Sequence, residues 1–484
     1  MLAGLAHPGF ALTPRPKLLV LLLLELSRAD FIDAVWSRLG VRGLRRLVEN
    51  GAYFPDCRHL ASSFPASTVA TLATGTWPAH HGIVADRWYD RKERGAVRAS
   101  AEALLATTFA AQVASPETRV YVVSQEERKG ALLAGTPLAH RFWMSDDGRF
   151  STMGESPAWL VDYNRSRPLG DLHDADWLAV GARPGAPALR RLKYDPARPL
   201  DFLALYKASP FSQSAVFEFA GELLIREKLG QGNTFDLLCM VVSSSAQLGY
   251  DTGAPSPLMD QMTLRLDRDL SVLLDQLDTA PGGNRYDFVL AGAHGAPAEP
   301  PAIARQRMAV PGESLAQAVQ RRLTQNRTGR IEKYLYPFLY LDYTGGRAPE
   351  PVALAAARAA MEEEAVAGFY TAGGECSVHD EWERRYRNSF HPVRSGDVML
   401  AYQPDYVEDF GGGRGISYGS LYDYDVKVPL CLFGPQFRAG SFEAPVEAVD
   451  LAPTLARAIG VTPPSSSVGR VLGEAFAAGE EPRR

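Results

Sequence analysis

The sequence has no long hydrophobic run and no surplus of positive charge. Its most apolar early stretch, Leu18–Leu24, is far shorter than the roughly 18 residues that a membrane span needs. The formal net charge is -5, and basic residues do not gather with aromatic ones. A membrane or a nucleic acid is therefore not expected as a partner, while the ligand or protein partner stays unknown.

Cysteine is also scarce. The chain has four cysteines in 484 residues, and none of them forms a C-x-x-C pair or stands at zinc-finger distance from histidines. Cys239 and Cys431 lie in apolar, strand-like runs and are expected to be core residues. At this point a disulfide between Cys57 and Cys376 remains open.

A cleavable leader is not expected either. The apolar run that follows Arg15 and Lys17 has the charge pattern of a signal-peptide core, but it ends at Glu25 without a small-residue cleavage site. A buried parallel strand explains the run better. The cytoplasm is therefore the expected compartment.

What the sequence does contain is an alternation of apolar runs and amphipathic helical segments. This alternation predicts an α/β fold with a doubly wound, mostly parallel sheet and helices on both faces. Leucines spaced close to 3.6 residues apart predict a helix over residues 261–277. The expected strands are Leu18–Leu24, Val120–Val123, Leu237–Ser243, Phe288–Gly292, Asp397–Ala401 and Val428–Phe433.

We expect one domain over residues 1–484 with an inserted lid. Residues 130–210 are poor in strand patterns and rich in proline, arginine and aspartate. In doubly wound proteins, ligands bind at the carboxyl edge of the sheet. The interval 130–210 is therefore predicted to be a lid or cap region over that edge.

Three stretches carry a resemblance to a known family. Residues 74–90 read TGTWPAHHGIVADRWYD, residues 264–270 read LRLDRDL and residues 449–455 read VDLAPTL. Together they are similar to motifs of the alkaline-phosphatase superfamily, in particular its type I phosphodiesterase/nucleotide pyrophosphatase branch, along essentially the whole chain. The resemblance implies an alkaline-phosphatase-like fold. It also implies two zinc-like ions, held by three Asp and three His, beside a Thr or Ser nucleophile.

The metal-ligand positions implied by this resemblance are mostly replaced. The family aspartate at the end of the first strand is Glu25 here, and the Asp-His pair after a later strand has become Ala293 and His294. Glu25 and His294 are therefore the candidate metal ligands, and two protein ligands rarely hold a divalent ion tightly. We expect no cofactor, with at most one residual divalent metal. The remaining family positions hold Ala246, Tyr250 and Tyr418.

The nucleophile and the phosphate contacts implied by the resemblance are altered too. Ser67 and Thr68 are the candidate catalytic residues, although capping of a helix is the competing and stronger interpretation of their position. Arg128 and Asp86 are the candidate substrate-binding residues. Asp86 stands where relatives have Asn, and Glu126 lies in the segment where relatives place a Lys, so both add negative charge that repels a phosphate dianion.

These replacements favour a catalytically inactive homologue that has lost two-metal phosphoester hydrolysis. Such a protein would act in binding, as a scaffold or in regulation. The alternative is an active hydrolase of phosphate or related esters with a rebuilt site that uses one metal or none. That site would be built on Glu25, His294 and either Ser67 or Thr68, with Asp251, Asp423 and Asp425 as further candidates. A third possibility is a purely structural partner subunit.

Overall fold

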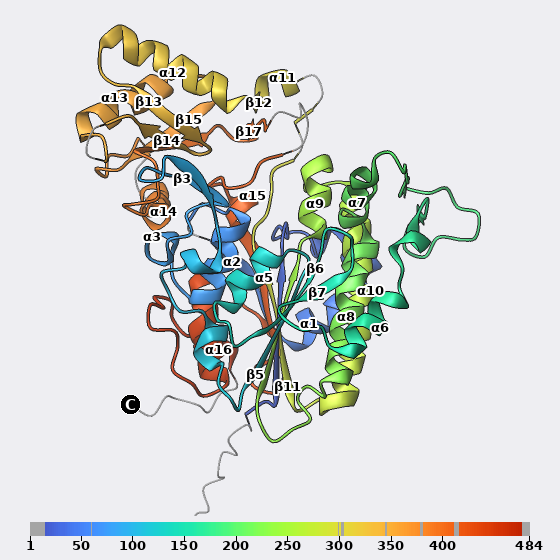
Figure 1. Ribbon diagram of the computed structural model, residues 1–484. Coiled ribbons are helices and arrows are strands. Elements are labelled where there is room, and N and C mark those ends of the chain that lie inside the picture. Colours follow the sequence, from blue (N-terminus) through green and yellow to red (C-terminus); the bar gives the residue numbers. More distant parts are fainter. Residues whose placement is uncertain are drawn as a thin grey trace, which may run out of the picture.

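The computed structural model describes residues 15–59, 61–298, 300–301, 304–343, 346–377, 381–410 and 416–476. A ten-stranded sheet forms its centre (Figure 1). The strands are β1 (Leu18–Leu24), β2 (Ala52–Arg58), β5 (Arg119–Ser124), β6 (His140–Met144), β7 (Phe150–Thr152), β10 (Asp236–Val242), β11 (Tyr286–Gly292), β18 (Lys427–Phe433), β19 (Gly440–Ser441) and β20 (Val446–Glu447). Their order is β19-β2-β18-β11-β1-β10-β5-β6-β7, and β20 pairs with β2.

The strands at the centre of this sheet are parallel. β1 pairs in parallel with β10 and β11, and β5 joins β10 in the same direction. β18 runs antiparallel to β11 and to β2. All residues of β1 are buried, as expected for a strand covered on both faces. The predicted α/β fold with a mostly parallel sheet is confirmed.

Helices cover both faces of the sheet (Figure 1). Leu19, Leu21 and Leu23 of β1 share a core with α2 (Pro65–Thr74), α5 (Glu127–Ala134) and α16 (Leu451–Ala458). The alternate residues of β1 face the opposite core, which contains α1 (Leu44–Asn50), α8 (Pro210–Arg226) and α10 (Pro257–Leu277). α10 confirms the helix predicted over residues 261–277. The shorter helices are α3 (Pro78–His81), α4 (Phe109–Val113), α6 (Ala158–Arg165), α7 (Pro199–Lys207), α9 (Ser244–Thr252) and α15 (Asp423–Val426).

A second lobe stands beside the main sheet. It is built on a four-stranded antiparallel sheet whose order is β13 (Ile331–Leu335), β14 (Phe338–Leu341), β16 (Val398–Tyr402), β15 (Val366–Thr371). Two helices, α12 (Gly312–Asn326) and α13 (Glu350–Ala360), pack on this sheet through their own apolar core. The strand expected near residues 397–401 therefore exists, as β16, but it belongs to this lobe and not to the central sheet.

The interval 130–210 is not a lid along its whole length. β6 and β7 lie within it and extend the central sheet beyond β5. The rest of the interval contains α6, α7 and a two-stranded sheet of β8 (Asp176–Trp177) and β9 (Arg190–Arg191). The lid prediction is therefore wrong for residues 140–152. These strands were missed because β6 mixes charged and apolar residues, as strands near a sheet edge do.

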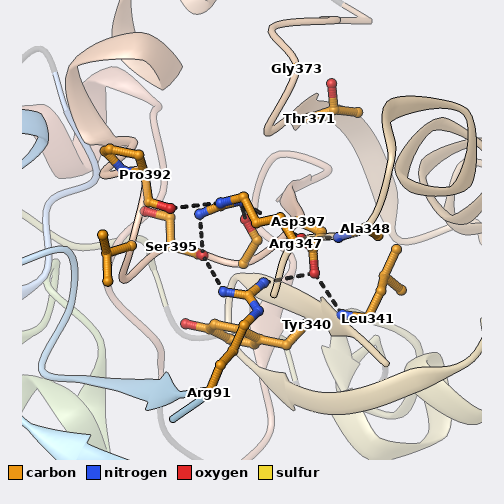
Figure 2. A network of polar contacts seen from close by, with 12 residues as sticks. Arg91, Tyr340, Leu341, Arg347, Ala348, Thr371, Gly373, Pro392, Ser395 and Asp397 are labelled. Carbon is orange, nitrogen blue, oxygen red and sulfur yellow. Dashed lines mark hydrogen bonds and ion pairs between the residues drawn. The ribbon is translucent and has the colours of Figure 1, made fainter. Parts of the chain in front are cut away.

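A two-stranded hairpin, β3 (Arg87–Asp90) and β4 (Gly95–Arg98), lies under the second lobe (Figure 1). Asp397 of the second lobe connects the hairpin to that lobe. Its fully buried carboxylate accepts a hydrogen bond from Arg91 Nη2 at 2.7 Å and one from the N–H of Leu341 at 2.7 Å. Arg347 lies 3.8 Å away on the other side (Figure 2). A buried carboxylate between two guanidiniums is a compensated charge, so this network holds the hairpin against the lobe.

All four cysteines are free thiols, so Cys57 and Cys376 are not bonded to each other. Cys239 and Cys431 are buried, as predicted. Among the described helices, none combines the length and the apolar character of a membrane span. The cytoplasmic location stays a prediction.

Candidate active site

Glu25 stands at the carboxyl edge of the central sheet, directly after β1. The next residue, Leu26, has a φ of +53°, a left-handed conformation that leucine rarely adopts. Its side chain packs so closely on Gly249 that a Cβ there would collide with it. Strained turns of this kind concentrate at functional sites. Here the turn fixes the direction in which Glu25 leaves the strand.

Lys129 of α5 bridges two carboxylates at this edge. Its Nζ lies 2.7 Å from Glu25 Oε2 and 2.7 Å from Glu126 Oε1. Burial alone lowers the pKa of Lys129, but the two carboxylates outweigh it and raise the pKa above the ordinary value. Lys129 therefore stays an ammonium ion at neutral pH.

The two carboxylates titrate differently. Burial raises the pKa of Glu25 to about 7, although Lys129 opposes the shift. Burial also acts on Glu126, but there Lys129 outweighs it and the pKa is lowered. Within the described part of the chain, Glu25 Oε1 has no hydrogen-bond partner. Environments that push the pKa values of two neighbouring acids apart are typical of acid–base sites.

Glu25, Glu126 and Lys129 line a cavity of about 500 Å³. This volume falls in the range of small-molecule sites. The wall comes from α2, the hairpin, α5 and α9, together with Phe410 and Tyr418. Its other residues are Pro65, Ala66, Asp86, Arg87, Arg98, Ala99, Arg128, Leu132, Ala246, Gln247, Tyr250, Phe410 and Tyr418.

The two predicted substrate-binding residues both reach this cavity. Arg128 is exposed on α5 and has no recorded ion pair among the described residues. Asp86 precedes β3, and its Oδ1 accepts a hydrogen bond from the N–H of Ala66 at 2.8 Å. Partial desolvation in the cavity wall raises the pKa of Asp86, while this N–H lowers it. Asp86 thus also satisfies a backbone donor in the first turn of α2.

Ser67 and Thr68, the predicted catalytic residues, do not line the cavity. The Ser67 hydroxyl donates to the carbonyls of Ser62 and Phe64, both at 2.9 Å. The Thr68 hydroxyl donates to the carbonyls of Phe64 at 3.1 Å and Pro65 at 3.0 Å. Both side chains are buried. Their hydroxyls donate to carbonyls and cap no backbone N–H, so the capping interpretation is wrong, and the nucleophile role stays a prediction.

His294 is buried at the end of β11, the strand beside β1: the N–H of Ala293 donates to the carbonyl of Leu24, and the carbonyl of His294 accepts from the N–H of Ser27, both at 2.8 Å. Its Nδ1 is 2.8 Å from the carbonyl of Gly295, and its ring centroid is 4.7 Å from that of Tyr418. Burial lowers the pKa of His294 to about 3, and the charge of Lys129 adds to this effect. The imidazole is therefore neutral. In the described structure, Nε2 is buried without a hydrogen-bond partner.

A pair of zinc ions does not fit this donor set. The described residues include no group of three or more His, Cys, Asp or Glu placed to hold a metal ion. Tyr418 donates from its hydroxyl to the carbonyl of Ala246 at 2.7 Å, so two of the replaced positions contact each other. Structural zinc sites use four protein ligands and catalytic sites three. The residues that the structure describes therefore do not provide the two-zinc site of the family.

Lys129 is the residue of this site that sequence reasoning missed. Its neighbour Arg128 was the basic residue singled out in this segment. The available signal was Glu126 three positions before Lys129, the spacing of an ion pair on a helix. No local pattern indicated that Lys129 would contact Glu25, which is 104 positions away in the sequence.

The chain matches the family model described as type I phosphodiesterase / nucleotide pyrophosphatase over residues 19–412. It belongs to this family. Alkaline phosphatase PhoV of Synechococcus elongatus is 25% identical over 95% of this chain and 92% of its own length. Alkaline phosphatase PafA of Elizabethkingia meningoseptica is 23% identical over 95% of this chain and 94% of its own. The family resemblance of the motifs is confirmed.

Solved structures show the same fold. The crystal structure of wild-type alkaline phosphatase PafA matches with a TM-score of 0.83 at 20% identity and covers 96% of this chain and 100% of that one. Murine ectonucleotide pyrophosphatase / phosphodiesterase 5 matches with a TM-score of 0.57 at 14% identity, covering 93% and 96%.

These comparisons correct two expectations. The hypothesis of a catalytically inactive homologue is wrong, because PhoV and PafA, which match nearly the whole chain, are named alkaline phosphatases and nothing in the comparisons indicates lost activity. The expectation of no cofactor is also overturned. The family implied by the motifs works with zinc-like ions, and the alkaline phosphatase relatives place this chain within it. Metal dependence is thus the rule of the family, although the described residues do not fit its two-ion site.

Proposed function

We propose that this protein hydrolyses an ester of phosphoric acid or of a related acid at a site rebuilt around Glu25, Lys129 and Glu126. The observation that carries the proposal is the ammonium of Lys129, held 2.7 Å from both carboxylates in the wall of a cavity of about 500 Å³. A fixed cation beside a carboxyl group with a free oxygen suits water activation next to an anionic ester. Family membership supports the same class of reaction.

In the proposed reaction, Glu25 is the general base. Its unpaired oxygen accepts a proton from a water molecule while the oxygen of that water forms a bond to phosphorus. The bond between phosphorus and the ester oxygen breaks, and the leaving oxygen keeps the electron pair and takes a proton from solvent. A base with a pKa near 7 is half ionised at neutral pH and still accepts a proton well.

The charges of the cavity favour an ester with one negative charge. Lys129 and Arg128 attract an anionic group, whereas Glu126 and Asp86 repel it. A phosphodiester or a sulfate ester carries one charge near neutral pH and a phosphate monoester carries about two, so the acids oppose the monoester more strongly. We propose a small organic ester as the ligand. The net charge of -5 argues against nucleic acid or a membrane.

The test compares three nitrophenyl esters on purified protein: bis(4-nitrophenyl) phosphate, 4-nitrophenyl sulfate and 4-nitrophenyl phosphate. Each is assayed with and without added Zn²⁺, and turnover in either buffer supports the proposal. We expect at least one singly charged ester to be hydrolysed faster than the monoester. The rate should collapse in E25Q and persist in E127Q, a matched change at an exposed residue of α5 outside the cavity wall. No turnover of any ester, or full activity in E25Q, would remove the proposal.

A further inference from the structure

Two arginines face each other on the hairpin that forms part of the cavity wall. Arg87 opens β3, Arg98 closes β4, and the two are register partners. Directly opposite residues of an antiparallel pair have Cβ atoms about 5 Å apart, and like charges in this arrangement repel. Both side chains are exposed and both line the cavity. Neither has a recorded ion pair or side-chain hydrogen bond within the described structure.

The carboxylates that line the cavity bind groups other than these two arginines. Glu25 and Glu126 both bind Lys129. The charge of Arg87 lowers the pKa of Asp86, but the Oδ1 of Asp86 already accepts a hydrogen bond from the N–H of Ala66. Arg128 adds a third guanidinium that has no ion pair among the described residues. The cavity wall therefore displays three guanidiniums that form no ion pair with a carboxylate of the described residues.

The hairpin holds this arginine pair in place. Arg91, directly after β3, is fixed by the buried carboxylate of Asp397 (Figure 2). Tyr89 of β3 donates from its hydroxyl to Glu332 of β13 at 2.9 Å. Arg394 stacks over the ring of Trp88 at 5.0 Å. The two like charges are thus presented by strands that are anchored to the second lobe.

The rest of the wall suits an organic body. Phe410 and Tyr250 lie on the same cavity, and Phe410 is 52% exposed. Aromatic side chains of this kind pack against apolar or aromatic parts of a ligand. The cavity thus combines one cationic region at Lys129, a second at the arginine pair and aromatic surface in the same wall.

We propose that Arg87 and Arg98 bind a second oxyanion of the ligand, separate from the ester group beside Lys129. Guanidinium groups bind carboxylate, sulfonate and phosphate oxygens through paired, charge-assisted hydrogen bonds. The substrate is then an ester whose organic part carries its own negatively charged group. The reaction assigned to that substrate rests on the proposed function, whereas the anion binding does not.

Two stable probes test the binding. Benzenesulfonate carries one oxyanion and 4-sulfobenzoate carries two, and neither contains an ester bond to hydrolyse. Isothermal titration calorimetry at low ionic strength, where exposed charges are least screened, measures both affinities. We expect the wild-type protein to bind 4-sulfobenzoate about tenfold more tightly, equivalent to roughly 1.4 kcal/mol. R87Q/R98Q should bind both probes equally, with its affinity for benzenesulfonate unchanged.

The control variant R183Q/R268Q removes the same charge from exposed arginines outside the cavity wall and should keep the preference. The inference is overturned if the wild-type protein does not bind 4-sulfobenzoate or shows no preference for it, or if R87Q/R98Q keeps the preference. Thermal unfolding adds a second readout. Since a repulsive pair is removed, the Tm of R87Q/R98Q should not fall below that of the wild type, and a clear drop would show that the arginines are structural.

The experiments can contradict either of the two proposals without contradicting the other. A wild-type protein that prefers 4-sulfobenzoate but hydrolyses no ester would contradict the proposed function alone. A protein that hydrolyses esters through Glu25 but binds the two probes equally would contradict the arginine site alone.

Discussion

Lys129 and Glu25 form an ion pair of 2.7 Å that joins α5 to the end of β1. Glu126, on the other side of Lys129, makes the pair a bridge of two carboxylates and one ammonium. The charges compensate each other, and the bridge supplies both a proton acceptor and a fixed positive charge in one cavity.

Replacing Lys129 tests the bridge. K129M leaves Glu25 and Glu126 facing each other without a cation, so the pKa of Glu25 should rise further because its main opposing charge is gone. We expect the free energy of unfolding to fall by about 1–3 kcal/mol, less than for a fully trapped charge since Glu25 can take up a proton. Urea denaturation measures the loss. K129R keeps the charge and should recover most of the stability, and equal losses in both variants would contradict the ion-pair explanation.

The pH dependence of hydrolysis follows from Glu25. The general base must be ionised, and its pKa is about 7. Below that pH, kcat/KM for the best ester should fall by about tenfold per pH unit, and above it the rate should level off. In K129M the inflection should move to higher pH. A rate independent of pH between 5.5 and 8, in buffers of roughly constant ionic strength, would exclude Glu25 as the base.

His294 should make the protein sensitive to acid. Burial lowers its pKa to about 3 from an ordinary 6.5. The unfolded chain therefore binds a proton that the folded chain does not, and the stability that His294 contributes is lost as pH falls from 6.5 toward 3. H294Q, which cannot be protonated, should reduce the proton uptake on unfolding in this range by about one. Denaturant midpoints between pH 4 and 7 measure this proton uptake for the wild type and for H294Q. The same slope of the unfolding free energy against pH in both proteins would contradict the neutral imidazole.

Asp397 anchors the hairpin that carries the arginine pair. D397N leaves Arg91 and Arg347 beside a neutral group in a buried network. We expect a loss of about 3 kcal/mol in the free energy of unfolding, because breaking a buried ion pair strands its partners. D162N, which breaks the exposed pair of Asp162 and Arg165, is the matched control and should change stability by less than about 1 kcal/mol. Similar values for the two variants would show that the network does not hold the hairpin.

Most of the fold could be predicted from the sequence wherever burial alone determines the pattern of apolar residues. β1 is apolar at every position because both of its faces are covered, and α10 shows its buried stripe in the spacing of its leucines. β6 was missed because it mixes charged and apolar residues near the edge of the sheet. The strand predicted at residues 397–401 was correct, but the pattern of a strand does not say which sheet it joins.

The site was harder to predict because its geometry depends on tertiary contacts. Glu25, Asp86 and Arg128 were found from motif positions, and all three reach the cavity. Ser67 and Thr68 did not reach it, since the rotation of α2 about its axis decides which side chains face outward. Lys129 gained its role only when folding brought α5 next to β1.

The most direct measurement is the initial rate at pH 8 at which the wild-type protein, E25Q and E127Q hydrolyse the better of the two singly charged nitrophenyl esters. We expect turnover by the wild type and by E127Q, with a reduction in E25Q of about a hundredfold or more, the size of a general-base contribution. Equal rates in all three proteins would contradict this expectation.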